Sequence, residues 1–232
     1  MTKTNLLKYL VPVGVLLAFS SIASAALVAP GTAGVPLAAT TETGTIIAST
    51  SATVCNIIGC GAGTTLKVTY SEWVYQEAGG TLDFVIQATN DAIAGGTVIE
   101  DVTTAGFAGA GTTTTDLGFS STSAGLLPIV GGLDPKTGSR TLDSDGGGIV
   151  GFNYGIASPI PQGKSTDYLI IKTNQTTYVP GTVSFQDGVS ASGPGFGVAP
   201  EPNMACLLSV LSIGILGIAY RRKKSVAKNT EV

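Results

Sequence analysis

Apolar and polar residues alternate most clearly between residues 66 and 88. The alternation runs over 66–70, stops at a glycine-containing turn at 78–80, and resumes over 82–88. Strict alternation predicts strands with one buried face, and a short glycine turn between two such strands predicts an antiparallel hairpin. We therefore expect this stretch to form the centre of a β-domain.

Large aromatic residues change the phase of this alternation. Trp73 and Tyr75 fall on the opposite face from the apolar residues of 66–70. One extra residue in a strand shifts the phase by one position, so we predict a β-bulge near 71–72. Trp73, Tyr75 and Phe84 are then the expected core anchors.

Five shorter runs rich in Thr, Val and Ile are separated by Gly and Asp clusters, which is typical of an all-β protein. They lie at 45–50, 97–104, 149–154, 168–173 and 181–186. The run at 168–173 has apolar residues on both faces, which favours a central strand. With the hairpin, these runs predict an antiparallel β-sandwich over residues 43–190.

Three segments beside these strands lack a regular pattern. Residues 26–42 are rich in Ala, Pro and Gly and are predicted to be a leader or linker, and residues 191–199 a Gly/Pro linker. Residues 120–145 are predicted to be mostly loop, with Leu126 and Ile129 packed inward.

The N-terminal residues follow the pattern of a secretory signal. Lys3 and Lys8 precede an apolar run over 9–19, and small residues then lead to Ala25. This order predicts a signal peptide over 1–25, formed as a helix and removed after Ala25. A retained N-terminal anchor is the alternative.

A second apolar run, at 204–220, contains no charged residue and is followed by a basic cluster. As a helix it is about 25 Å long, at the short end of a membrane span. Cations after an apolar span stay on the cytoplasmic side, so Arg221, Arg222, Lys223 and Lys224 are the expected membrane stop. Residues 225–232 then form a cytoplasmic tail. A buried core helix is the alternative.

A short proline motif precedes this apolar run. Ala199 and Glu201 each stand before a proline and are therefore driven into extended conformations, which leaves Pro200, Glu201 and Pro202 accessible to a processing enzyme. Motif, apolar helix and basic end, together residues 200–224, resemble the PEP-CTERM sorting signal of Gram-negative bacteria that make extracellular polysaccharide. The tail beyond the basic cluster departs from many members of that family.

The resemblance implies an exosortase-type membrane protease as the partner. Three segments of the predicted sandwich, 74–76, 80–84 and 168–174, look like ectodomains of uncharacterised PEP-CTERM surface proteins. We therefore expect a non-enzymatic exported protein that is anchored in the inner membrane as a precursor and then reaches the cell surface or extracellular matrix, with polysaccharide as a possible partner. A carbohydrate- or calcium-binding module of the cell envelope is the alternative function.

The charge distribution and cysteine usage fit an exported protein. The net charge is −3, and most basic residues lie near the two ends, so the stretch between them is strongly acidic. An acidic surface disfavours nucleic acid as a partner. Cys55 and Cys60 are close together in a Gly-rich stretch and are candidates for a disulfide in an oxidising compartment.

Few residues suggest catalysis or a cofactor. The chain has no histidine, which excludes a histidine-based triad and disfavours zinc. Asp143 and Asp145 precede three glycines, and with Asp134 they are weak calcium candidates, although their spacing departs from the EF-hand pattern. An acidic turn is the alternative, and no other cofactor is expected.

Overall fold

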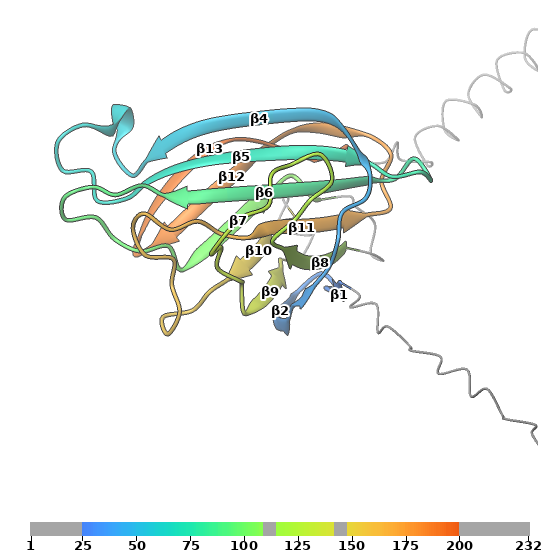
Figure 1. The fold of residues 1–232 in the computed structure, drawn as a ribbon, viewed down its shortest axis with the longest axis horizontal. Coiled ribbons are helices and arrows are strands. Elements are labelled where there is room, and N and C mark those ends of the chain that lie inside the picture. Colours follow the sequence, from blue (N-terminus) through green and yellow to red (C-terminus); the bar gives the residue numbers. More distant parts are fainter. Residues whose placement is uncertain (1–24, 109–114, 142–147, 200–232) are drawn as a thin grey trace, which may run out of the picture.

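Two antiparallel sheets stack face to face around the core. The computed structural model describes residues 25–108, 115–141 and 148–199. Within them the chain is all-β, as the alternation predicts, and the sheets pack as in a β-sandwich (Figure 1). The described residues include no helix with the length and apolarity that a membrane crossing requires. Both predicted terminal helices, over 1–25 and 204–220, fall almost wholly outside these ranges.

The first sheet, sheet A, contains seven strands. In spatial order they are β1 (Ala26–Leu27), β8 (Thr115–Ser120), β11 (Tyr168–Thr173), β6 (Leu82–Asn90), β5 (Lys67–Gln76) and β4 (Thr45–Cys55), with β3 (Ala38–Ala39) pairing with β8. β11 is hydrogen-bonded to β6 on one side and β8 on the other. The prediction of a central strand at 168–173 is therefore confirmed.

The second sheet, sheet B, contains six strands. In spatial order they are β13 (Val189–Val198), β12 (Tyr178–Asp187), β7 (Asp101–Ala105), β10 (Val150–Asn153), β9 (Thr137–Arg140) and β2 (Thr32–Pro36). A 3₁₀ turn, η1 (Ile58–Cys60), lies in the loop after β4.

The main core fills the space between the sheets. Phe84 from sheet A and Phe152 and Phe185 from sheet B are fully buried there. Burial of each such side chain contributes about 1.5–3 kcal/mol relative to exposure in water. The alternation along β6 thus places the predicted anchor Phe84 in the core.

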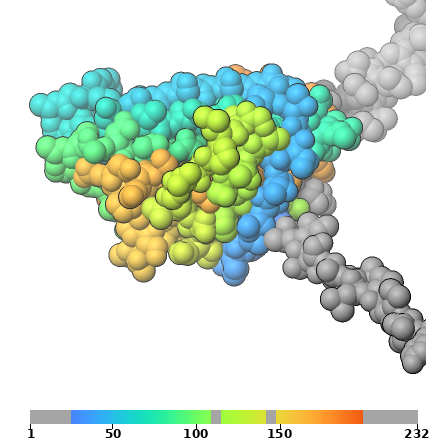
Figure 2. Space-filling view, viewed as in Figure 1, coloured from blue at the N-terminus to red at the C-terminus, as the bar shows by residue number. Residues whose placement is uncertain are grey.

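A second apolar cluster lies on the outer face of sheet A. Tyr75 and Tyr168 are buried in it, and Leu126 and Ile129 pack against it from the segment that follows β8. Figure 2 shows this segment, in yellow-green, lying over the strands of sheet A. The predicted inward packing of Leu126 and Ile129 is confirmed.

The predicted bulge near 71–72 is wrong. β5 pairs with β6 in unbroken register from Val68 to Gln76. The phase change arises because Glu72, a charged residue, continues the inward-facing series, while Trp73 and Tyr75 belong to the outer cluster. The irregularity lies instead in β4, between Ile46 and Ala48.

Both predicted linkers contain strands instead. Residues 26–42 contain β1, β2 and β3, which pair with strands of both sheets. Residues 191–199 belong almost entirely to β13, and their glycines permit a close approach to β5. A Cβ at Gly193 would lie 2.4 Å from the Tyr70 hydroxyl, and one at Gly195 would lie 2.6 Å from Glu72 Oε2.

Candidate functional site

A short segment, residues 40–44, crosses one end of sheet A. We call it the crossover segment. It begins beside β8, where Thr40 N donates to Phe119 O at 2.8 Å, and it ends at the start of β4. Figure 1 shows the chain bending from β4 around this end of the sandwich toward β1 and β2. At Gly44 the approach to β5 is so close that a Cβ would lie 2.8 Å from Gln76 O.

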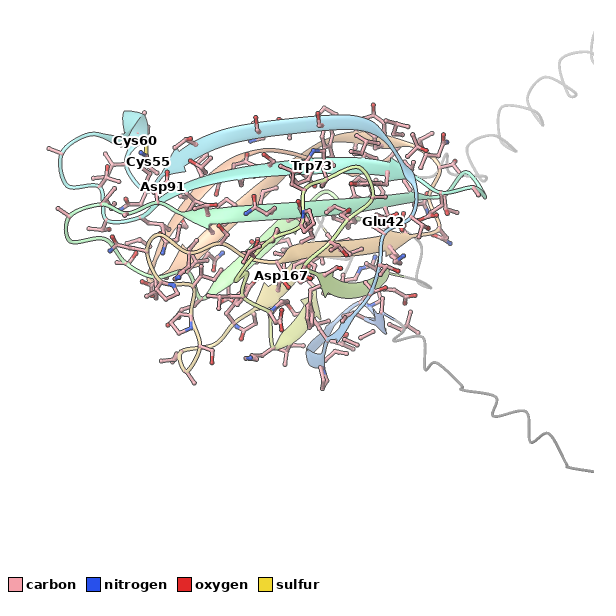
Figure 3. All side chains as sticks on the ribbon, viewed as in Figure 1. Glu42, Cys55, Cys60, Trp73, Asp91 and Asp167 are labelled. Atoms are coloured by element: carbon pink, nitrogen blue, oxygen red, sulfur yellow. A yellow bond between two sulfur atoms is a disulfide. The ribbon has the colours of Figure 1, made fainter. Side chains whose placement is uncertain are left out.

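Three carboxyl groups meet under this crossover. Glu42 comes from the crossover segment, Glu77 from the turn after β5, and Asp83 from β6. One oxygen of each lies within 4.8 Å of one oxygen of each of the others. Glu42 and Asp83 are buried, with 4% and 2% of their surface exposed, and Glu77 is half-buried. We call this set the carboxyl cluster (Figure 3, at Glu42).

The two oxygens of Glu42 have different surroundings. Oε1 accepts hydrogen bonds from the backbone N–H groups of Thr43 and Gly44, both at 3.0 Å. Oε2 is buried and has no hydrogen-bond partner. Because a buried carboxylate oxygen without a partner is costly, the cluster is set up for an additional positive group.

Lys172 on β11 supplies part of that positive charge. Its Nζ lies 3.6 Å from Asp83 Oδ2 and 4.0 Å from Glu42 Oε2, and it donates to Thr41 O at 2.9 Å. One ammonium group therefore faces three carboxyl groups. The excess negative charge of the three carboxyl groups can therefore be neutralised by either a bound proton or a cation.

The electrostatics favour a proton when no cation is present. Burial, and after it the neighbouring carboxyls of Glu77 and Asp83, raise the pKa of Glu42 to about 9. The neighbouring Glu42 side chain lowers the pKa of Glu77. Glu42 is thus the proton-holding member of the pair. Burial also raises the pKa of Asp83.

A second buried glutamate lies inside the sandwich. Glu72 projects from β5 into the core and is 0% exposed. Its Oε2 accepts the Phe196 N–H of β13 at 2.8 Å, and its Oε1 has no partner. Burial raises the pKa of Glu72 to about 8. Because a lone carboxyl offers too few ligands for a metal, its role is to hold β13 against β5.

The predicted disulfide is present. Cys55 at the end of β4 is bonded to Cys60 in η1, with a Cα–Cα distance of 5.3 Å. Figure 3 shows the two cysteines and Glu42 at opposite ends of the long axis. The disulfide therefore closes the loop after β4 and has no part in the carboxyl cluster.

The predicted calcium set is only partly described. Asp143 and Asp145 lie outside the described residues. Asp134 is exposed and lies beside Asp167, whose pKa is raised to about 6 by burial and by the Asp134 carboxyl. The sequence pattern did not predict that the Asp134 and Asp167 carboxyl groups lie next to each other.

The predicted sorting residues also lie outside the described residues. These are the motif at 200–202 and the basic cluster at 221–224. The described part of the chain ends at Ala199, whose N–H donates to Thr177 O at 3.1 Å.

Sequence reasoning did not find the carboxyl cluster. Asp83 falls on the polar phase of an alternating strand, where acidic residues are common, and Glu42 falls in a predicted linker. Only the path of the crossover segment brings these two residues together. No spacing in the sequence signals that path.

Comparisons with family models, curated proteins and solved structures found no match to this chain. The fold therefore defines only a broad class, an all-β protein with two antiparallel sheets. A function has to be inferred from the chemistry of its own residues.

Proposed function

We propose that this chain is an exported, non-enzymatic protein of the cell surface or extracellular matrix. The observation that supports this function most strongly is the order of three parts: Pro200-Glu201-Pro202, the apolar run at 204–220 and the basic cluster at 221–224. An exosortase-type protease recognises the motif while the apolar run holds the precursor in the inner membrane.

The position of the last strand supports this proposal. β13 ends at Val198, so the motif follows the sandwich almost directly. Processing there would separate a finished sandwich from the apolar run without cutting into a strand. The Cys55–Cys60 disulfide fits an oxidising compartment outside the cytoplasm.

Partners of the released protein follow from its surface charge. Basic residues are concentrated near the ends of the chain, so the sandwich itself is acidic and unsuited to nucleic acid. Neutral extracellular polysaccharide is a compatible neighbour in the matrix.

The sorting proposal is tested by a double substitution, Pro200→Ala with Glu201→Ala, expressed in a Gram-negative host with an exosortase. We expect the variant to remain in the inner membrane at precursor mass, because the protease loses its recognition motif. Glu231→Ala, in the tail, is the matched control and should mature normally. Intact-mass analysis and cell fractionation measure both. Maturation of the double variant to the wild-type mass and location would overturn the proposal.

A calcium-binding module of the cell envelope is the second candidate function. The carboxyl cluster favours it over sugar binding, because three converging carboxyl groups are the donors that calcium prefers. Titration of the full chain, purified in detergent and freed of metal with a chelator, tests this function. Saturable calcium binding supports it, and no binding at millimolar calcium rules it out.

A further inference from the structure

We propose that Glu42, Glu77 and Asp83 bind one hard divalent cation of calcium's chemistry, and that the bound cation fixes the crossover segment to the end of sheet A. The inference rests on the second candidate function and names its site. It does not depend on how the protein is sorted.

The donor set is the first reason. Each of the three carboxyl groups offers an oxygen, and these oxygens lie within 4.8 Å of one another. Calcium takes six to eight oxygen ligands and accepts carboxylates in one- or two-oxygen geometry. Thr43 is exposed and Glu77 is half-buried, so water reaches this side of the cluster and can complete the coordination.

The second and independent reason is Glu42 Oε2, a buried oxygen without a hydrogen-bond partner. Glu42 is buried and held in place by the Thr43 and Gly44 N–H groups on Oε1. Those two bonds leave Oε2 without a hydrogen-bond partner beside the other carboxyl groups. Lys172 Nζ lies 4.0 Å from this oxygen, beyond hydrogen-bond distance, so a metal ion placed between the carboxyl oxygens would supply the direct partner that Oε2 lacks.

The surrounding charges permit a cation despite Lys172. Its ammonium group lies 3.6 Å from Asp83 Oδ2 and 4.0 Å from Glu42 Oε2, and it donates to Thr41 O. Asp116 on β8 faces the same ammonium group and adds a further negative charge. The carboxyl groups of Glu42, Glu77, Asp83 and Asp116 thus outnumber the one ammonium group at the cluster.

The choice of cation follows from the type of ligand atom and from the elements that carry the ligands. Zinc prefers nitrogen and sulfur ligands, which this set lacks. Magnesium demands near-ideal octahedral geometry and gives up its water reluctantly, whereas calcium tolerates irregular sets. Carboxyl groups from a crossover, a turn and a strand form such an irregular set.

The effect on structure follows from where the ligands originate. Glu42 belongs to the segment that joins β1, β2 and β3 to β4, whereas Glu77 and Asp83 flank the β5–β6 turn. Direct ties across this junction include the Lys172–Thr41 bond and the weaker Thr43–Glu77 bond at 3.2 Å. A shared cation adds a bridge between the two parts and restricts opening of the crossover.

Calorimetric titration of the full chain in detergent tests the site. We expect one calcium ion per chain, and at least a tenfold loss of affinity in Glu42→Gln and in Glu77→Gln. Glu77 is half-buried, so its variant keeps the test valid if the Glu42 variant is unstable. Asp187→Asn, at the β12–β13 turn, is the matched control and should bind as the wild type does. Magnesium should bind at least tenfold more weakly than calcium.

Hydrogen exchange tests the second half of the inference. Calcium should slow exchange of amides in residues 38–46 of the wild-type chain and leave Glu77→Gln unchanged. Undiminished calcium binding in both glutamine variants, with loss in Asp143→Asn/Asp145→Asn, would overturn the site while sustaining calcium binding as a function. No calcium binding at all would overturn both. Calcium binding without slower exchange at 38–46 would overturn the claim that the cation fixes the crossover segment to sheet A.

Discussion

Glu42 and Glu72 are both buried glutamates with a raised pKa, yet their surroundings differ. Each has one oxygen that accepts a hydrogen bond from backbone N–H and one oxygen without a hydrogen-bond partner. Glu42 shares its site with two other carboxyl groups and a lysine near solvent. Glu72 stands alone between the sheets, covered by β13. The number of converging ligands, and not burial, separates a candidate binding site from a structural tie.

Glycines explain how Glu72 came to be enclosed. β13 lies against β5 because Gly193 and Gly195 leave space for Tyr70 and Glu72. The Tyr70 hydroxyl also donates to the Pro194 carbonyl of the same strand. Two polar side chains of β5 therefore hold an otherwise glycine-rich edge strand, and the Glu72 side chain that contacts β13 is fully buried.

The largest expected effect comes from removing the enclosed carboxyl group. Glu72→Ala should lower the free energy of unfolding by about 3 kcal/mol, because it leaves a cavity and an unpaired Phe196 N–H. Glu77→Ala, at a half-buried position, should cost less than about 0.5 kcal/mol without calcium. Urea unfolding in the presence of a chelator measures both, and equal losses would contradict the distinction.

The second prediction uses the pH dependence of Glu72. Its pKa is raised from 4.5 to about 8 in the fold, so the folded chain holds a proton that the unfolded chain releases. The stability from this group is complete below pH 4.5 and is lost as pH rises through about 8. Glu72→Gln removes this titration and should gain on the order of 2 kcal/mol relative to wild type between pH 5 and 7.

The variant has to be compared with wild type, because the raised pKa of Glu42 also makes the free energy of unfolding fall as pH rises. Unfolding of both proteins at several pH values measures the difference. A constant difference between the two proteins across this range would mean that Glu72 is ionised in the fold.

The third prediction concerns the fit between β13 and Glu72. A Cβ at Gly195 would lie 2.6 Å from Glu72 Oε2 and 2.8 Å from Val183 Cγ2. Gly195→Ala should therefore cost about 1–3 kcal/mol through overpacking. In a Glu72→Ala background the cost should fall, since one of the two clashes is gone. A double-mutant cycle by thermal unfolding measures this coupling, and strict additivity would contradict it.

The pattern of the sequence predicts much of the fold and little of the site. Alternation along 82–88 predicts which side chains reach the core, because a strand has only two faces. The same reasoning wrongly predicted a bulge at Glu72, because a charged residue in an inward-facing position breaks the apolar alternation. It also failed at 26–42, since short strands without large apolar residues leave no periodic signal. Glu42 joins Asp83 only through a tertiary crossover, and such a contact has no local pattern.

The last prediction concerns Lys172, which borders the carboxyl cluster. Lys172→Met removes an ammonium group 4.0 Å from Glu42 Oε2. Without calcium, stability should fall by about 1 kcal/mol or less, because the side chain is partly exposed. Calcium affinity should rise about fivefold, since a competing positive charge is gone.

Glu72→Gln is the matched control for this last experiment and should leave calcium affinity unchanged, because Glu72 offers no ligand to the cluster. Calorimetric titration of both variants measures the two affinities. An affinity that stays constant in Lys172→Met, or that changes in Glu72→Gln, would place the bound ion elsewhere. The carboxyl cluster would then be a proton-holding contact within the fold and no binding site.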